Sequence, residues 1–319
     1  MLDLSSIRSL AITGANGFVG RSVIEKISSL KSDKLPKAIT LITRRGIDFK
    51  IPKSITEITK YIELDLTESW KIDFNITHLI NLAADGSNSP YSSEANEAFK
   101  EIGKNLVEWS ESCKVFPKVF HASSGACYGI NSLTPETKEI NSKSDFIASR
   151  IIVEDILKNA SASGKFQLSV GRLFTFIGPN LWTKKQYAIN QFIQSAISES
   201  KIYVKGNPQT VRSFMHQDAM AGWILKSLVS SINATDLQIG SSKAVTIQEL
   251  AEFIAIETRS EVLYTGEFES GDIYLPDNSA TMSRLGLDEG LDWKSSVKEM
   301  LNVLRMERNA AGYESNFRG

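Results

Sequence analysis

The segment Leu10-Ala11-Ile12-Thr13-Gly14-Ala15-Asn16-Gly17-Phe18-Val19-Gly20 decides the fold of this chain. Its apolar start predicts a buried strand over residues 10–12, and an amphipathic run over residues 18–30 predicts the first helix. Between them, Gly14 permits a sharp turn, Gly17 lets the backbone approach a pyrophosphate, and Gly20 lets the helix pack closely on the strand. The helix N-terminus then directs unpaired N–H groups at the phosphates. The segment therefore predicts a dinucleotide-binding loop rather than a simple glycine turn.

Composition and charge narrow the class of protein. The 319 residues are 42% hydrophobic and 23% charged, enough for one large core or two smaller ones. A net charge of −1 gives no reason to expect a nucleic-acid partner or a membrane surface. Two cysteines, an early first strand and no apolar run of about 18 residues favour a cytoplasmic protein without a signal peptide or membrane helix. The three histidines lack metal-ligand spacing, so no metal site is expected.

Strands and helices alternate along most of the chain. Further strands are expected over residues 37–43, 61–66, 78–84, 118–122, 167–174, 202–204 and 237–240, and further helices over residues 93–113, 145–158, 187–198, 219–230 and 246–257. This alternation predicts the α/β class, with a Rossmann-type doubly wound parallel sheet of about seven strands. The Rossmann domain is expected to comprise residues 1–177 plus 212–240, and a smaller C-terminal substrate domain residues 178–211 plus 241–308. Residues 309–319 have little pattern and are expected to form a loose tail.

The residues after the second predicted strand bear on the choice of cofactor. Arg44-Arg45-Gly46 stands where a dinucleotide fold faces the adenosine ribose. A carboxylate there accepts a hydrogen bond from a 2′-hydroxyl, whereas an arginine accommodates a 2′-phosphate. Arg44, and less directly Arg45, therefore favour NADP(H) over NAD(H), the alternative being a solvated basic turn.

Several motifs, in order along the chain, resemble those of the extended short-chain dehydrogenases/reductases, the NAD-dependent epimerase/dehydratase family. They are the glycine segment, Asp65-Leu66, Leu82-Ala83-Ala84, the run Ser123-Ser124-Gly125-Ala126-Cys127-Tyr128-Gly129, Gly171-Arg172-Leu173-Phe174 with Gly178-Pro179, and Arg212-Ser213-Phe214-Met215-His216. The resemblance covers nearly the whole chain. It implies hydride transfer at a sugar carbon of a nucleotide-activated sugar, and a homodimer formed through helices 94–112 and 145–158.

The glycine segment, the basic turn and the resemblance together give a set of binding residues. The expected cofactor site consists of Gly14, Asn16, Gly17, Phe18, Val19, Gly20, Arg44, Asp65, Leu66, Leu82, Ala83, Ala84 and Arg150. The resemblance implies that Asp65 hydrogen-bonds the adenine and that Ser124 holds the reacting oxygen. For the substrate it implies Ser124, Asn180 and the diphosphate-binding Arg212, with Lys184 and Lys185 adding positive charge at the rim.

The sequence departs from the family at the catalytic dyad. The family uses Tyr-x-x-x-Lys on the helix after the serine, and here the two positions hold Phe146 and Arg150. Phenylalanine cannot move a proton, and arginine has a different shape and reach from lysine. No tyrosine lies between Tyr128 and Tyr187, so no shift of register restores the dyad.

Two interpretations follow from the altered dyad. In the first, the protein is an NADPH-dependent reductase of a nucleotide-activated keto sugar. Its catalytic positions are then Ser124, Phe146 and Arg150, with Ser124, Tyr128, Asp85 or water as the proton source. In the second, the protein binds cofactor or sugar nucleotide without turnover, in a regulatory or assembly role. Loss of general acid–base help slows a reaction by about 10²–10⁴-fold without forbidding it, and the intact substrate-side motifs favour the first interpretation.

Overall fold

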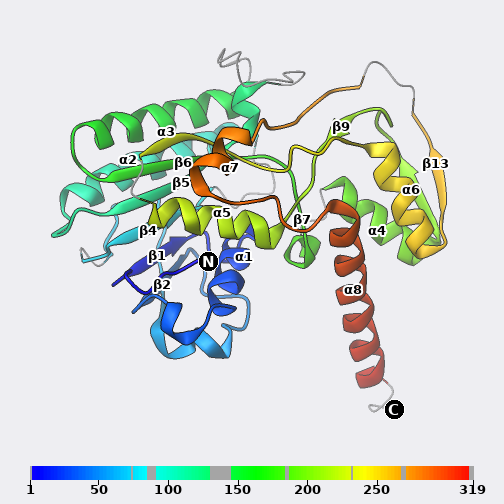
Figure 1. Cartoon of the computed structure of the whole chain (residues 1–319), viewed down its shortest axis with the longest axis horizontal. Coiled ribbons are helices and arrows are strands. Elements are labelled where there is room, and N and C mark those ends of the chain that lie inside the picture. Colours follow the sequence, from blue (N-terminus) through cyan, green and yellow to red (C-terminus); the bar gives the residue numbers. More distant parts are fainter. Residues whose placement is uncertain are drawn as a thin grey trace.

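The computed structural model describes residues 2–72, 75–84, 91–129, 145–183, 187–230, 233–266 and 271–315. A main sheet of seven parallel strands organises them, in the order β11-β6-β5-β4-β1-β2-β3 (Figure 1). The strand order reverses direction between β1 and β4, as in a doubly wound sheet, where ligands bind at the carboxyl edge. The predicted α/β class and Rossmann-type sheet are confirmed.

The strands of the main sheet are short and mostly buried. Their bounds are β1 (Leu10–Thr13), β2 (Ile39–Thr43), β3 (Thr59–Glu63), β4 (His78–Asn81), β5 (Lys118–Ser124), β6 (Gln167–Leu173) and β11 (Ala234–Ile239). Both faces of the sheet are covered, which is why every residue of β1 and β2 is buried rather than every second one. The expected late strand at 237–240 is β11, and it pairs parallel with β6.

Helices cover the two faces of the sheet, each with its own core. On one face, α2 (Ser93–Glu111) and α3 (Asp145–Ala162) pack together and bury Phe99, Leu106 and Leu157. On the other face, α1 (Phe18–Ser28) and α5 (Gln217–Val229) pack together and bury Ile24 and Trp223. Both layers leave the carboxyl edge of the sheet open.

A smaller unit lies beside that edge (Figure 1). It contains a two-stranded parallel sheet and three helices around a separate core that includes Phe192, Ile254 and Leu301. Its elements are α4 (Ala188–Glu199), β8 (Lys201–Val204), α6 (Ile247–Thr258), β13 (Glu261–Tyr264) and α8 (Trp293–Ser315). Two small pairings connect the units: β7 (Phe176–Ile177) with β10 (Met215–His216), and β9 (Val211–Arg212) with β12 (Val245–Thr246).

The C-terminal third differs most from the prediction. Helix α8 extends through Ser315, so the expected tail over 309–319 is wrong for residues 309–315. Val297, Met300, Leu301 and Leu304, within the expected substrate domain, are buried at helical spacing, and the helix that they anchor continues into the region expected to be loose. A further helix, α7 (Ser279–Leu285), packs against β11 and α5, although the prediction placed it in the substrate domain.

The described residues also form short helical turns, and they contain neither a membrane-spanning helix nor a metal-binding group. The turns are η1 (Ser32–Lys34), η2 (Lys53–Ile58), η3 (Gly125–Tyr128) and η4 (Pro179–Thr183). Within the described ranges, no helix has the length and apolar character needed to cross a bilayer. The same residues contain no group of three or more His, Cys, Asp or Glu side chains arranged to hold a metal ion.

Candidate functional site

Two clefts open at the carboxyl edge of the main sheet. The smaller has a volume of about 460 Å³ and lies over the ends of β1, β2 and β4. The larger, of about 870 Å³, lies between the sheet and the smaller unit. Gly17 lines the first and Phe18 lines the second, so the N-terminus of α1 stands where the clefts meet. A ligand with two ends joined by phosphates could occupy both.

The glycine loop forms a cradle that side chains would fill. Gly14 has φ +68°, and a Cβ there would lie 2.8 Å from the Leu82 carbonyl oxygen. A Cβ at Gly20 would lie 2.4 Å from the carbonyl oxygen of Gly14. Gly17 is the N-cap of α1, and among the described residues no side chain hydrogen-bonds that helix end. A helix N-terminus with uncapped N–H groups suits a pyrophosphate, so these residues fit a dinucleotide.

A buried chain of hydrogen bonds fixes the turn opposite the glycine loop. The Thr13 hydroxyl accepts hydrogen bonds from the backbone N–H groups of Leu82 (3.0 Å) and Ala83 (3.1 Å). The same hydroxyl donates to Asn81 Oδ1 at 2.8 Å, and Asn81 Nδ2 lies 3.1 Å from His121 Nδ1. The predicted strand over 78–84 ends at Asn81, and Leu82, Ala83 and Ala84 form a turn that lines the smaller cleft. Thr13, Asn81 and His121 therefore hold a wall of the expected cofactor site.

Cationic and anionic side chains meet at the far end of the smaller cleft. Arg44 and Arg45 follow β2, are exposed and line this cleft. Asp65 and Leu66 line it from the loop after β3. Hydrogen bonds from the backbone N–H and the hydroxyl of Thr67 lower the pKa of Asp65, which keeps this carboxylate ionised.

Asn16 ties the glycine loop to the basic turn. Its side chain donates to the Gly46 carbonyl oxygen at 2.8 Å and accepts from the backbone N–H of Asp48 at 3.3 Å. Gly46 itself has φ +61°, a conformation that favours glycine. The expected cofactor residues of both loops are thus brought together, although Asn16 acts through a loop contact.

Ser124 ends β5 and lines the larger cleft. Its hydroxyl accepts a hydrogen bond from the backbone N–H of Ala126 at 3.2 Å and so caps the turn η3. Tyr274, from the C-terminal part of the chain, lines the same cleft, and the Ser124 hydroxyl acts to lower the pKa of its phenol. Ser124 is half-buried, so its hydroxyl can reach a ligand in the cleft.

An ion pair buried behind Ser124 holds this end of the sheet. Glu154 on α3 is 1% exposed and accepts two hydrogen bonds from Arg172 on β6, at 2.9 and 2.7 Å. It also accepts one from the Ser123 hydroxyl at 2.6 Å. Burial alone would raise the pKa of Glu154, but the hydrogen bonds from Arg172 and Ser123 outweigh it and lower the pKa to about 2. The pair is ionised and joins β5, β6 and α3.

Tyr128 belongs to this network rather than to the cleft wall. The Arg172 guanidinium lies 4.5 Å from the centre of its ring, and the Phe174 ring stacks on it at 6.3 Å. Burial raises the pKa of Tyr128. It is not among the described residues that line either cleft, which places this expected proton source behind the wall.

Phe146 and Arg150, which occupy the two dyad positions, lie in different surroundings. Phe146 lines the larger cleft, as its position in the motif implies. The Arg150 guanidinium lies between two rings, 4.0 Å from the centre of Phe146 and 3.9 Å from that of Phe99. It is 6% exposed, and its Nη1 donates to Asn96 and Ser149. Burial lowers the pKa of Arg150 to about 10.

The placement of Arg150 corrects the expectation that it holds a ribose. It is absent from the described lining of both clefts. Phe99 on α2 supplies the second ring, and the resulting cation–π contacts keep the side chain inside the α2–α3 layer. The sequence of α3 alone could not indicate this contact.

Arg212, like Ser124, lines the larger cleft. Its Nη1 donates to the carbonyl oxygens of Val211 at 2.8 Å and Asp272 at 3.3 Å. The guanidinium lies 5.8 Å from the centre of the Tyr274 ring. Burial lowers the pKa of Arg212, but the group remains cationic at neutral pH. The larger cleft therefore carries a fixed positive charge.

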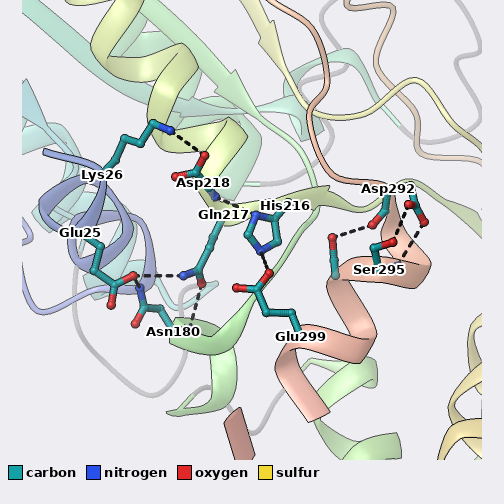
Figure 2. A network of polar contacts seen from close by, with 10 residues as sticks. Glu25, Lys26, Asn180, His216, Gln217, Asp218, Asp292, Ser295 and Glu299 are labelled. Atoms are coloured by element: carbon teal, nitrogen blue, oxygen red, sulfur yellow. Dashed lines mark hydrogen bonds and ion pairs between the residues drawn. The ribbon is translucent and has the colours of Figure 1, made fainter. Parts of the chain in front are cut away.

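Asn180 lies away from both clefts. Figure 2 shows its side chain with Glu25 and Gln217 between α1 and the start of α5. Its Nδ2 donates to Glu25 at 2.7 Å, and its backbone N–H donates to Gln217 at 2.9 Å. The expected substrate contact of Asn180 is thus replaced by one that joins η4 to α1. Asp85, Lys184 and Lys185 lie outside the described residues.

Most of the chain matches a known protein family. The model of the family described as "NAD dependent epimerase/dehydratase family" matches residues 10–240. No curated protein matches the chain.

Many solved structures share the fold. One is a UDP-N-acetylglucosamine 4-epimerase from Methanobrevibacter ruminantium M1 in complex with UDP-N-acetylmuramic acid, with 22% identity, TM-score 0.79, and coverage of 96% of this chain and 100% of that one. A second is a UDP-glucose 4-epimerase from Thermotoga maritima with UDP-glucose (18%, 0.78, 94% and 99%). A third is a UDP-glucuronic acid 4-epimerase from Bacillus cereus in complex with UDP-glucuronic acid and NAD (16%, 0.76, 93% and 99%).

Proposed function

Because the chain belongs to the NAD dependent epimerase/dehydratase family, we propose that it is an NADPH-dependent reductase of a nucleotide-activated keto sugar. One observation carries the choice of reaction. The cleft that holds Ser124 and Arg212 presents a phenyl ring, Phe146, at the motif position where the family places its proton-transferring tyrosine. Oxidation of an alcohol requires a group at that position that removes the hydroxyl proton, and a phenyl ring cannot do so. Reduction of a ketone makes a smaller demand on the same position.

The smaller cleft would take the adenosine and phosphate part of the cofactor. Gly14, Gly17 and the first N–H groups of α1 would bind the pyrophosphate, and Asp65 would bind the adenine. The turn over residues 82–84 would form the wall beside them. A bound reduced nicotinamide would supply the hydride that adds to the carbonyl carbon of the substrate. The side chains and backbone of this chain would bind the cofactor and the substrate, orient them, and deliver a proton.

The larger cleft would take the sugar nucleotide. Arg212 offers a guanidinium suited to paired phosphate oxygens, and Ser124 would hold the carbonyl oxygen that is reduced. The volume of about 870 Å³ accommodates a molecule of nucleotide-sugar size. The structural neighbours named above support this class of ligand, since each is described in complex with a UDP-sugar.

A direct assay separates this function from binding without turnover. Purified protein with NADPH should oxidise the cofactor when given UDP-4-keto-6-deoxyglucose or its dTDP counterpart, and should epimerise or dehydrate UDP-glucose slowly. Fast epimerisation of UDP-glucose would show that Phe146 is no obstacle. Binding of UDP-glucose without oxidation of NADPH in the presence of any keto sugar would favour a regulatory or assembly role. The buried Arg150 and the apolar Phe146 are also compatible with that role.

The preference for NADPH rests on the basic turn after β2. We expect Arg44→Ala to weaken NADPH binding about tenfold and NADH binding less than threefold, because a charge-assisted bond to an exposed 2′-phosphate contributes about 1.5 kcal/mol. Fluorescence titration with each cofactor measures both constants. Arg284→Ala is the matched control, since that arginine pairs with Asp236 away from the clefts. Wild-type protein that binds NADH as tightly as NADPH would contradict the preference.

The role of Arg212 is tested by substrate affinity. We expect Arg212→Ala to weaken UDP-glucose binding about tenfold, through loss of charge-assisted bonds to the diphosphate. Arg212→Lys should recover part of the affinity, because the charge is kept while the two-point geometry is lost. Isothermal calorimetry gives the constants, and circular dichroism checks the fold. Unchanged affinity in Arg212→Ala would place the diphosphate elsewhere.

We also propose a homodimer formed through α2 and α3. Ile152 on α3 is 44% exposed, so this layer presents a large apolar side chain to solvent. A sedimentation mass of one chain at micromolar concentration would argue against the dimer.

A further inference from the structure

A tyrosine from outside the expected catalytic motif reaches the larger cleft. Tyr274 lies beside β9: its backbone N–H donates to the Val211 carbonyl oxygen at 3.1 Å, and the N–H of Val211 donates to Asp272 at 2.7 Å. Its ring packs on Phe174 with centres 4.9 Å apart. These contacts fix a segment of the C-terminal region against the carboxyl edge of the main sheet.

The Tyr274 hydroxyl meets Ser124 in that cleft. Both side chains line the cleft, and the Ser124 hydroxyl acts to lower the pKa of the Tyr274 phenol. A Cβ on Gly125 would lie only 2.7 Å from the Tyr274 hydroxyl oxygen and 2.7 Å from the ring of Phe174. The glycine after Ser124 therefore makes room for this phenol. Phe146, at the motif position of the family's tyrosine, lines the same cleft from α3.

We propose that Tyr274 is the proton donor of this protein, delivering its hydroxyl proton to the ketone oxygen that Ser124 holds. This inference rests on the proposed reductase function and adds to it a catalytic residue from the C-terminal part of the chain. Tyr274 replaces neither Phe146 nor Arg150 in sequence position. It supplies to the same cleft the phenol that α3 lacks.

The surroundings of Tyr274 keep its phenol protonated. Burial raises the pKa of the phenol, and Cys127 and Tyr91 raise it further, while the Ser124 hydroxyl and the cation of Arg212 act in the opposite direction. The phenol is therefore protonated at neutral pH, so a proton is available for reduction.

The step balances in atoms and electrons. The carbonyl carbon gains two electrons and a hydrogen from the reduced nicotinamide, which is thereby oxidised. The O–H bond of Tyr274 breaks, and a new O–H bond forms on the substrate oxygen, giving an alcohol. The tyrosinate regains a proton from cleft water, and the Arg212 cation opposes its negative charge meanwhile.

The test compares Tyr274→Phe with wild type in the full chain. With NADPH and UDP-4-keto-6-deoxyglucose, we expect kcat to fall about 10²-fold or more, the usual contribution of a general acid. The KM for the keto sugar and the calorimetric Kd for UDP-glucose should change less than about threefold. Tyr264→Phe is the matched control, because that exposed phenol bonds Glu252 away from the clefts and its loss should leave kcat unchanged.

A second measurement is independent of turnover. Ultraviolet difference titration should detect one phenol fewer in Tyr274→Phe, and the missing one should ionise above the usual range for tyrosine. Normal kcat in Tyr274→Phe would overturn the assignment while leaving the reductase function intact. Equal losses of kcat and of UDP-glucose affinity would overturn it in favour of a structural role, and ionisation at an ordinary pH would contradict the buried placement of the phenol on which the assignment rests. Wild-type protein inactive on every keto sugar would overturn both the function and the assignment.

Discussion

Replacing Glu154 by alanine is expected to lower the free energy of unfolding by about 3–5 kcal/mol. Glu154 is 1% exposed and accepts three hydrogen bonds from Arg172 and Ser123, and a fourth, at 3.0 Å, from Lys158. Removing the carboxylate leaves the Arg172 guanidinium buried without its counter-ion. The cost is therefore that of an uncompensated charge, in addition to the lost contacts.

Urea denaturation at pH 7.5 measures this loss. Glu111→Ala is the matched control: its ion pair with Lys165 is about half-exposed on the surface, and its removal should cost less than about 1 kcal/mol. A double change, Glu154→Leu with Arg172→Met, should be more stable than Glu154→Ala, because it removes both charges together. A loss below about 1 kcal/mol in Glu154→Ala would contradict the interpretation. Because Ser123 precedes Ser124, we also expect the single variant to lose activity.

The first part of the fold could be predicted because its signals are local. The apolar run of residues 10–12 and the glycines at 14, 17 and 20 are neighbours in the sequence, and the structure uses them within one strand-turn-helix unit. The alternation of strands and helices then leaves few topologies for the rest of the sheet. The strand at 237–240 was predicted as one more strand of this alternation.

Long-range packing explains what the sequence did not indicate. Arg150 was expected to face a ribose because only its own helix was considered, but Phe99 from α2 completes the cage around its guanidinium. Asn180 was expected near the substrate, and Glu25 on α1 holds it instead. In both cases the deciding partner is more than 50 residues away in the sequence.

The C-terminal region shows the same limitation. The helix through Ser315 does have a local signal, the apolar spacing of residues 297, 300, 301 and 304, which the prediction of a loose tail overlooked. Tyr274 has none that points to Ser124, since 150 positions separate them in the sequence. The segment around Tyr274 reaches the site through its pairing with β9, which only the folded chain reveals.

Acid is expected to destabilise the protein through the histidine beneath the cofactor turn. Thr13 accepts hydrogen bonds from two backbone N–H groups, so its proton goes to Asn81 Oδ1, and Asn81 Nδ2 then donates to His121 Nδ1. This network assigns the ring proton of His121 to Nε2, which has no hydrogen-bond partner among the described residues. A second proton would have to enter at Nδ1, facing a donor. Burial lowers the pKa of His121 to about 4.

The sign and size of the effect follow from that pKa. At pH 7.5 the ring is neutral in the folded and the unfolded chain, whose ordinary pKa is 6.5. Between pH 6.5 and about 4 only the unfolded chain takes up the proton, so stability falls as the pH falls. At pH 5 the loss from His121 should be about 2 kcal/mol. His121→Asn keeps an acceptor for Asn81 but cannot titrate, so its unfolding free energy should drop about 2 kcal/mol less than that of wild type between pH 7.5 and 5. Urea denaturation at the two pH values gives the difference, in which His78 and His216 cancel because both proteins contain them. Equal pH dependence in the two proteins would mean that folding leaves the pKa of His121 near its ordinary value of 6.5, so that the folded chain also takes up the proton and the hydrogen-bond order beneath the turn over residues 82–84 does not oppose it.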